Sequence, residues 1–194
     1  MTKDVEILGQ FVEEPREKPL SQTSLETSAA DMLQNWRRVS LSSDFLAKYY
    51  SYYFPYKEKA KQKISRDEAE NTISFVMNEL IENTAKYADA GDKSVSIKIM
   101  LFEHEIVFQV SNYLTPALSD SFIGLAREIL VSNPEELYIR RLERNTESET
   151  GDSGLGYLTL INDYGIRLGF KFQKIDPELV QVTIQATMKS MEER

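Results

Sequence analysis

The chain has 194 residues, 41% of them hydrophobic and 28% charged, and a formal net charge of −8 at pH 7, values typical of one globular domain with a hydrophobic core. The negative charge disfavours a nucleic-acid partner, and the lack of cysteine excludes disulfides, thiolate metal sites and cysteine nucleophiles. Since no segment approaches the roughly 20 apolar residues that span a bilayer, and no signal-peptide pattern is present, we expect a cytoplasmic protein without a membrane partner.

The first 60 residues contain few clear periodic patterns. In chain order they predict a strand at 4–12, a connector at 13–24, a weak helix at 25–37, a short strand at 39–41 and a helix from 43 or 44 to Pro55. We therefore interpret residues 1–60 as an amino-terminal extension whose strand and helices pack on a core domain at 61–194. The two parts are expected to form one compact unit.

The strongest pattern predicts a long helix over residues 65–88. Ser65 and Glu68 have the spacing of a capping box, and apolar residues recur on one helical face from Ala69 to Tyr87. The elements expected after it are a β-hairpin at 95–101 and 106–110, helices at 116–131, 134–145 and 154–164, and an antiparallel pair at 166–174 and 179–188. This order predicts an α+β two-layer sandwich, in which helices cover one face of a mixed, largely antiparallel sheet.

Two polar residues of the long helix are candidates for chemistry. Glu79 and Asn83 lie one turn and about 40° apart, at the border of the apolar face. A carboxylate and an amide in this arrangement suit a hard cation such as Mg²⁺, which takes one or two protein ligands. The carboxylate also suits the task of orienting or deprotonating a hydroxyl group. A solvated helix edge is the alternative interpretation of the same pair.

A glycine-rich segment, GDSGLG at 151–156, precedes the helix of 154–164. Glycines let backbone amides approach a ligand closely, and a helix amino terminus favours anions. The segment is not a Walker A loop, because Tyr157 stands where the lysine belongs, and its glycine spacing differs from a Rossmann fingerprint. It is therefore a candidate phosphate-binding turn, with a simple tight turn as the alternative.

The two segments together resemble the GHKL (Bergerat-fold) ATP-binding superfamily over roughly residues 65–190. The N box is similar to NELIENTAKY at 78–87, and the G2 box is similar to GLGYL at 154–158. The resemblance implies ATP and Mg²⁺ as cofactors, with Glu79 as catalytic base and Asn83 as the metal ligand. It further implies nucleotide contacts from a wider set of residues: Lys86, Tyr87, Gly154, Leu155 and Gly156.

The G1 box of the superfamily has an aspartate and two glycines after a strand. Here the matching segment is VSNYLTP at 110–116, so Asn112 takes the place of the aspartate and the glycines are absent. The resemblance implies that the Asn112 side-chain oxygen accepts a hydrogen bond from the adenine amino group. The missing glycines favour a second hypothesis, in which nucleotide binding is weak or lost.

Glutamate at position 79 favours the serine-kinase and ATPase branches of the superfamily over histidine kinases. The nearest resemblance is to small stand-alone bacterial regulators of the anti-sigma-factor serine kinase or SiaB-like kind. It implies a serine/threonine kinase or anti-sigma-like switch with a STAS-domain or other signalling protein as partner, and a possible homodimer. The alternatives are a non-catalytic binding module with the GHKL shape and, more weakly, a small-molecule ATPase.

Two further segments have open interpretations. Tyr49, Tyr53 and Tyr56 fall on one side of the helix before Pro55, and core packing is preferred there over an aromatic partner or dimer surface. Arg140, Arg141 and Arg144 lie in the stretch that would cover the nucleotide, where they are either phosphate clamps or a solvated helix face. His104 is expected in an exposed β-turn.

Overall fold

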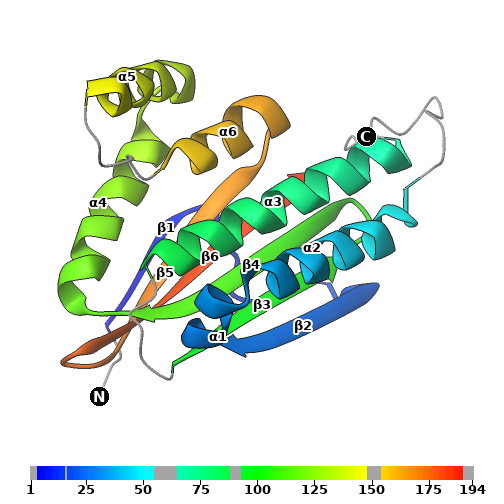
Figure 1. Cartoon of the computed structure of the whole chain (residues 1–194), viewed down its shortest axis with the longest axis horizontal. Helices are drawn as coiled ribbons and strands as arrows, with labels where there is room; N and C mark the ends of the chain where they lie inside the picture. Colours follow the sequence, from blue (N-terminus) through cyan, green and yellow to red (C-terminus); the bar gives the residue numbers. More distant parts are fainter. Residues whose placement is uncertain (1–3, 16, 55–64, 88–92, 148–153, 190–194) are drawn as a thin grey trace.

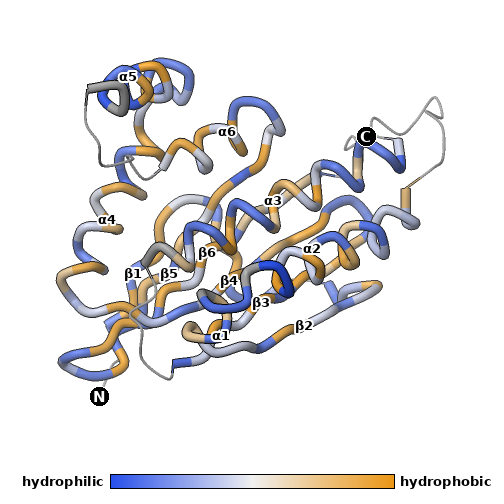
Figure 2. Tube along the Cα trace, viewed as in Figure 1, coloured by the Kyte–Doolittle hydropathy of each residue, from blue (hydrophilic) through white to orange (hydrophobic). Residues whose placement is uncertain are grey.

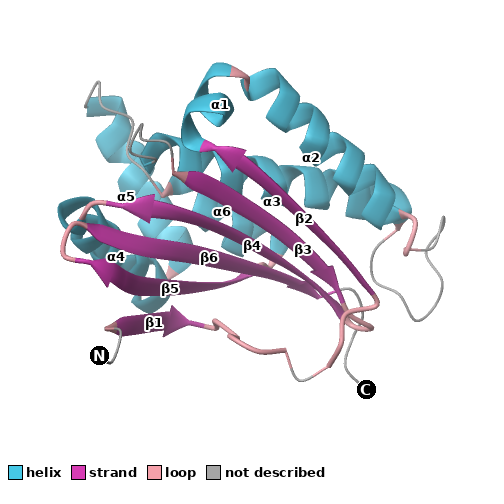
Figure 3. Cartoon of the chain, turned by 90° about the horizontal axis from the view of Figure 1, so that it is seen from below, coloured by secondary structure: helices cyan, strands magenta, loops and turns pink. Residues whose placement is uncertain are grey.

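The computed structural model describes residues 4–15, 17–54, 65–87, 93–147 and 154–189. Six helices lie on one face of a six-stranded sheet in this part of the chain (Figure 1, Figure 3). The strands are β1 (Val5–Gly9), β2 (Ser21–Ser28), β3 (Ser94–Leu101), β4 (Glu105–Leu114), β5 (Arg167–Asp176) and β6 (Leu179–Lys189). The helices are α1 (Ala29–Gln34), α2 (Trp36–Ser51), α3 (Arg66–Tyr87), α4 (Pro116–Val131), α5 (Pro134–Glu147) and α6 (Leu155–Tyr164).

The strand order is β1-β5-β6-β4-β3-β2, and every neighbouring pair is antiparallel. This confirms the predicted α+β two-layer class. The helices alternate between hydrophobic and hydrophilic residues along their length, as expected for elements that bury one face (Figure 2). None of the helices in the described ranges is long and apolar enough to cross a membrane.

The amino-terminal segment supplies both edges of the sheet. β1 pairs with β5 and β2 pairs with β3, while the chain between them crosses the face of the sheet that lacks helices (Figure 3). Backbone hydrogen bonds from Gln10 N to Leu168 O (3.0 Å) and from Leu20 N to Leu101 O (2.8 Å) attach the two ends of this crossing segment. Residues before 60 are thus part of the sheet itself, and the proposed boundary at residue 60 stays a prediction.

The structure differs from the sequence-based expectation near the amino terminus. Residues 21–28, expected as connector and weak helix, form β2, and residues 39–41, expected as a strand, lie inside α2. Serine and threonine dominate β2, so its alternation carries little hydropathy contrast. The strand at 39–41 was predicted from two apolar residues, Val39 and Leu41, that are two positions apart. In α2 these residues lie on different sides of the helix, because Val39 is buried and Leu41 is 68% exposed.

The long helix α3 matches its prediction closely. The capping box is formed, because Glu68 accepts hydrogen bonds from the Ser65 backbone N and Oγ, both at 2.8 Å. These bonds, the one from the backbone first, lower the pKa of the Glu68 carboxyl below its ordinary value. The predicted apolar face, from Ala69 and Ile73 to Leu80, is completely buried in the main core. This packing fixes which border of α3 faces α6.

The aromatic segment at the end of α2 divides between core and surface. Tyr50 is fully buried, and its hydroxyl group donates to Thr23 Oγ1 at 3.0 Å. Tyr49 and Tyr53 are 45% and 47% exposed, so the preferred interpretation of core packing was wrong for these two side chains. The helical turn directs Tyr50 inward, about 100° from Tyr49. Tyr56 lies outside the described residues.

Candidate functional site

The predicted motifs on α3 and α6 lie side by side. At one end, the rings of Phe75 and Tyr164 stack with centroids 4.8 Å apart. At the other end, Gly156 lies against Glu79 and Asn83. Because the numbering rises along α3 as it falls along α6, the two helices run antiparallel in contact (Figure 1). The first turn of α6 therefore faces the part of α3 that carries Glu79 and Asn83.

Gly156 permits this contact because it has no side chain. A Cβ atom at residue 156 would lie 1.8 Å from Oε2 of Glu79 and 3.4 Å from Nδ2 of Asn83. The first distance is far below any van der Waals contact, so a side chain here would displace the carboxylate. The half-buried Glu79 carboxylate is thus held at the amino-terminal turn of α6.

Asn83 is oriented by its own helix. It is only 3% exposed, and its Nδ2 donates to the backbone oxygen of Glu79 at 2.7 Å. This bond uses an N–H group of the Asn83 amide. The amide oxygen, which is the atom that binds hard cations, does not take part in it. The arrangement thus keeps a carboxylate and an amide oxygen on neighbouring turns of one helix border.

The turn before α6 contacts the arginine cluster. Gly154 caps α6 without a side-chain hydrogen bond and has φ +113°, a conformation that favours glycine. A Cβ at Gly154 would lie 3.3 Å from Nη1 of Arg141 and 3.0 Å from Cδ1 of Leu125. Arg141 is 5% exposed and forms an ion pair with Glu128 of α4. Arg141 is thus a buried connection between α4, α5 and the start of α6.

The other two arginines of the cluster, Arg140 and Arg144, are exposed on α5. The predicted solvated helix face is therefore confirmed for Arg140 and Arg144 and wrong for Arg141, and the phosphate clamp stays a prediction. The packing of Arg141 on Gly154 was not predicted from the sequence. The contact joins α5 to the start of α6, and local sequence patterns do not show how two helices pack on each other. His104 lies in the β3–β4 turn with 54% of its side chain exposed, as expected.

Asn112 lies on the helix-facing side of β4. Its neighbours at alternate positions, Val110 and Leu114, belong to the main core, and Asn112 itself is 3% exposed. It is thus a polar residue among apolar ones, beneath the helical layer. The chain then passes through Thr115, whose hydroxyl caps α4 by accepting from Leu118 N at 3.4 Å. β4 therefore leads through Thr115 directly into a capped helix.

Part of the predicted site lies outside the described residues. Lys86 and Tyr87 belong to the last turn of α3, but their side chains are outside the described residues, as are residues 151–153. Leu155 is half-buried in the first turn of α6. The structure thus brings together Glu79, Asn83 and Gly156, and it places Asn112 in the sheet.

The residues present fit a magnesium–nucleotide group in their chemistry. A carboxylate and a buried amide meet a glycine turn at a helix amino terminus, and Mg²⁺ usually takes only one or two protein ligands, with phosphate oxygens completing its shell. The described residues contain no group of three or more His, Cys, Asp or Glu side chains that could hold a metal ion.

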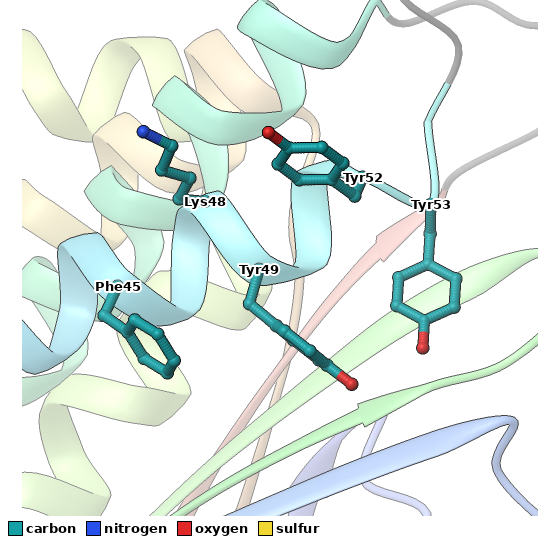
Figure 4. A pocket seen from close by; sticks show the side chains of 5 residues that line it. All are labelled: Phe45, Lys48, Tyr49, Tyr52 and Tyr53. Carbon is teal, nitrogen blue, oxygen red and sulfur yellow. The ribbon is translucent and has the colours of Figure 1, made fainter.

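A second surface feature lies on α2. Phe45, Lys48, Tyr49, Tyr52 and Tyr53 line a groove of about 460 Å³ (Figure 4). Hydrogen bonding to Ser21, and next to Tyr53, lowers the pKa of the Tyr49 hydroxyl. The pKa of the Tyr53 hydroxyl is raised, and the largest cause is its hydrogen bond with Tyr49. These contacts connect the exposed aromatic side chains with the beginning of β2.

Comparison with known proteins identifies similarity at the level of structure. No protein-family model matches the sequence, and no curated protein matches it. One similar solved structure is a chain of the crystal structure of the SiaB–SiaC complex from Pseudomonas aeruginosa, with a TM-score of 0.62 and 16% sequence identity. The similarity covers 89% of this chain and 92% of that chain, so the two share a fold over nearly their full lengths.

Proposed function

We propose that this chain is an ATP-binding regulatory protein that acts as a serine/threonine kinase on a bacterial signalling protein. The observation that carries the proposal is the contact of Gly156 with Glu79 and Asn83. It supports one site built from the N-box helix and the G2 turn, two segments about 75 residues apart in the sequence. The similarity in fold to a chain from a two-protein complex, SiaB–SiaC, supports a protein partner, for which we propose a STAS-domain protein.

Each residue has a role that follows from its chemistry. When bound, Mg²⁺–ATP supplies the phosphoryl group and its charge neutralisation. Asn83 holds the metal through its side-chain oxygen, and the amides of Gly154, Leu155 and Gly156 face the phosphates. Glu79 orients a serine or threonine hydroxyl of the partner and accepts its proton. Asn112 contacts the adenine amino group from the sheet, and Lys86 and Tyr87 lie near the phosphates.

The test separates binding from phosphate transfer. Titration calorimetry with a non-hydrolysable ATP analogue and Mg²⁺ should detect binding by the unmodified chain and by Glu79→Gln, but not by Asn83→Ala. Transfer from labelled ATP to a STAS-domain partner should be lost in Glu79→Gln. Glu82→Gln is the matched control, because Glu82 lies exposed on the same helix and its substitution should change neither measurement.

Two results would contradict this function. Transfer that survives in Glu79→Gln would exclude Glu79 as the base. Absence of both heat and thermal shift with nucleotide in the unmodified chain would favour the second candidate, a non-catalytic module that sequesters its partner. That candidate is supported by one observation, namely that β4 leads through Thr115 directly into a capped helix without a glycine turn.

A further inference from the structure

Among the residues that the structure describes, the outer edge of β2 is long and pairs with no other strand. Among the described strands, β2 pairs only with β3, over eight residues in continuous register from Ser21 to Ser28. Its sequence, SQTSLETS, has no lysine or proline and only one charged residue, Glu26, and no bulge interrupts it, whereas monomeric proteins usually protect such edges with charges, proline or bulges. The opposite edge, β1, has only five residues, and an ion pair joins its Glu6 to Arg127 of α4 at 2.7 Å.

An exposed aromatic stripe lies beside this edge. Phe45, Tyr49 and Tyr53 recur at every fourth position of the chain and are 68%, 45% and 47% exposed. They point toward the side of α2 where β2 lies, while Lys48 and Tyr52 point the other way (Figure 4). Since the neighbouring Tyr50 donates a hydrogen bond to Thr23 of β2 at 3.0 Å, the stripe lies directly beside the strand edge.

We propose that this surface, formed by the β2 edge and the stripe of Phe45, Tyr49 and Tyr53, binds a second copy of the chain. Two β2 strands related by a two-fold axis pair antiparallel and extend the sheet across both copies. With the axis at Ser24, Gln22 of one copy lies opposite Glu26 of the other. Glu26 is the only charged residue of β2, so no like charges face each other and an amide meets each carboxylate.

The stripe supplies the apolar area that a strand edge lacks. α2 runs antiparallel to β2, because its end contacts Thr23 through Tyr50 and its beginning contacts Asp31, just after β2, through Arg38. Phe45 therefore lies near the middle of β2, so the two-fold axis brings both copies of Phe45 together. Stable interfaces bury about 800 Å² per partner, and strand pairing combined with aromatic contacts on α2 is a self-complementary way to reach this area.

The first test is the oligomeric state, measured by light scattering and sedimentation. The 22.3 kDa chain is expected at twice this mass, and Phe45→Glu at the single-chain mass with unchanged circular dichroism. Val131→Glu is the matched control, since Val131 is 84% exposed on α4, and it should remain dimeric. A single-chain mass for the unmodified protein, or a dimeric Phe45→Glu, would overturn the proposal, and the first result would assign the stripe to a different partner.

The second test uses the absence of cysteine from the chain. Ser24→Cys places one thiol beside the axis, where mild oxidation should yield a disulfide-linked dimer under non-reducing electrophoresis. Gln22→Cys is the control on the same exposed face, because four strand positions then separate the two thiols and no crosslink is expected. A Ser24→Cys protein that does not crosslink would overturn pairing through β2. Neither experiment depends on nucleotide binding, so the outcome of both is independent of the proposed kinase function.

Discussion

Gly156 shows how one missing side chain positions two others. With a Cβ excluded by the Glu79 carboxylate at 1.8 Å, the first turn of α6 approaches α3 more closely than any other residue type would allow. The contact leaves a carboxylate and an amide at the amino terminus of α6, where backbone N–H groups favour anions. The identity of residue 156 is therefore expected to affect ligand binding more than folding, because the atom it would displace is the end of a flexible side chain.

We predict that Gly156→Ala weakens binding of a Mg²⁺–ATP analogue about tenfold or more, measured by calorimetry. The matched control is Gly124→Ala in α4, where a Cβ meets nothing within 4 Å. This control should leave binding unchanged and stabilise the fold by about 0.5–1 kcal/mol, since alanine is the better helix former. Equal affinities for Gly156→Ala and the unmodified chain would show that the α3–α6 contact does not belong to a nucleotide site.

At the scale of elements, α4, α5 and α6 are connected through Arg141. This side chain pairs with Glu128 of α4 and lies against Gly154 at the start of α6. A buried charge that loses its partner is costly, whereas an exposed arginine on the same helix contributes little. The Arg141–Glu128 ion pair thus lies against Gly154, at the start of α6.

We predict that Arg141→Met lowers the free energy of unfolding by about 2 kcal/mol, less than for a fully buried pair because Glu128 is partly exposed. Arg140→Met, on the exposed side of the same helix, should change it by less than about 0.5 kcal/mol. Urea denaturation of both variants measures the difference. Similar values for the two would mean that Arg141 does not fasten α5 to α4.

At the scale of the whole molecule, one core unites the amino-terminal segment with the rest. Met32, Leu46 and Tyr50 are 0–3% exposed and belong to the same cluster as Ile73 and Phe108. Both edge strands of the sheet also come from residues before 60. From this arrangement we expect that residues 61–194 do not fold independently, and the single compact unit stays a prediction.

We predict that the full chain unfolds in one cooperative transition and that residues 61–194 alone do not fold. Each large core side chain that is lost costs about 2–5 kcal/mol, so the removal of Met32, Leu46 and Tyr50 approaches the roughly 5–15 kcal/mol that stabilises a whole domain. Calorimetry and amide proton dispersion test this expectation. A cooperative transition and dispersed spectrum for 61–194 alone would establish it as a separate domain.

The sequence by itself determined the elements with strong local periodicity. The face of α3, its capping box, the two β-hairpins and the helical layer all follow from patterns within about 20 residues. It also placed Glu79 and Asn83 on one helix border, because a fixed rotation per residue relates them. Their proximity to Gly156 was inferred from a resemblance and not from any periodicity.

Only the tertiary structure decided the features that depend on contacts between distant segments. The polar strand β2 is defined by its pairing with β3, and Tyr49 and Tyr50 differ in exposure because the sheet covers one side of α2. Arg141 and Gly154 meet through helix packing. Such contacts depend on how whole elements dock, and a local hydropathy pattern contains no information about which edge, face or turn will lie opposite it.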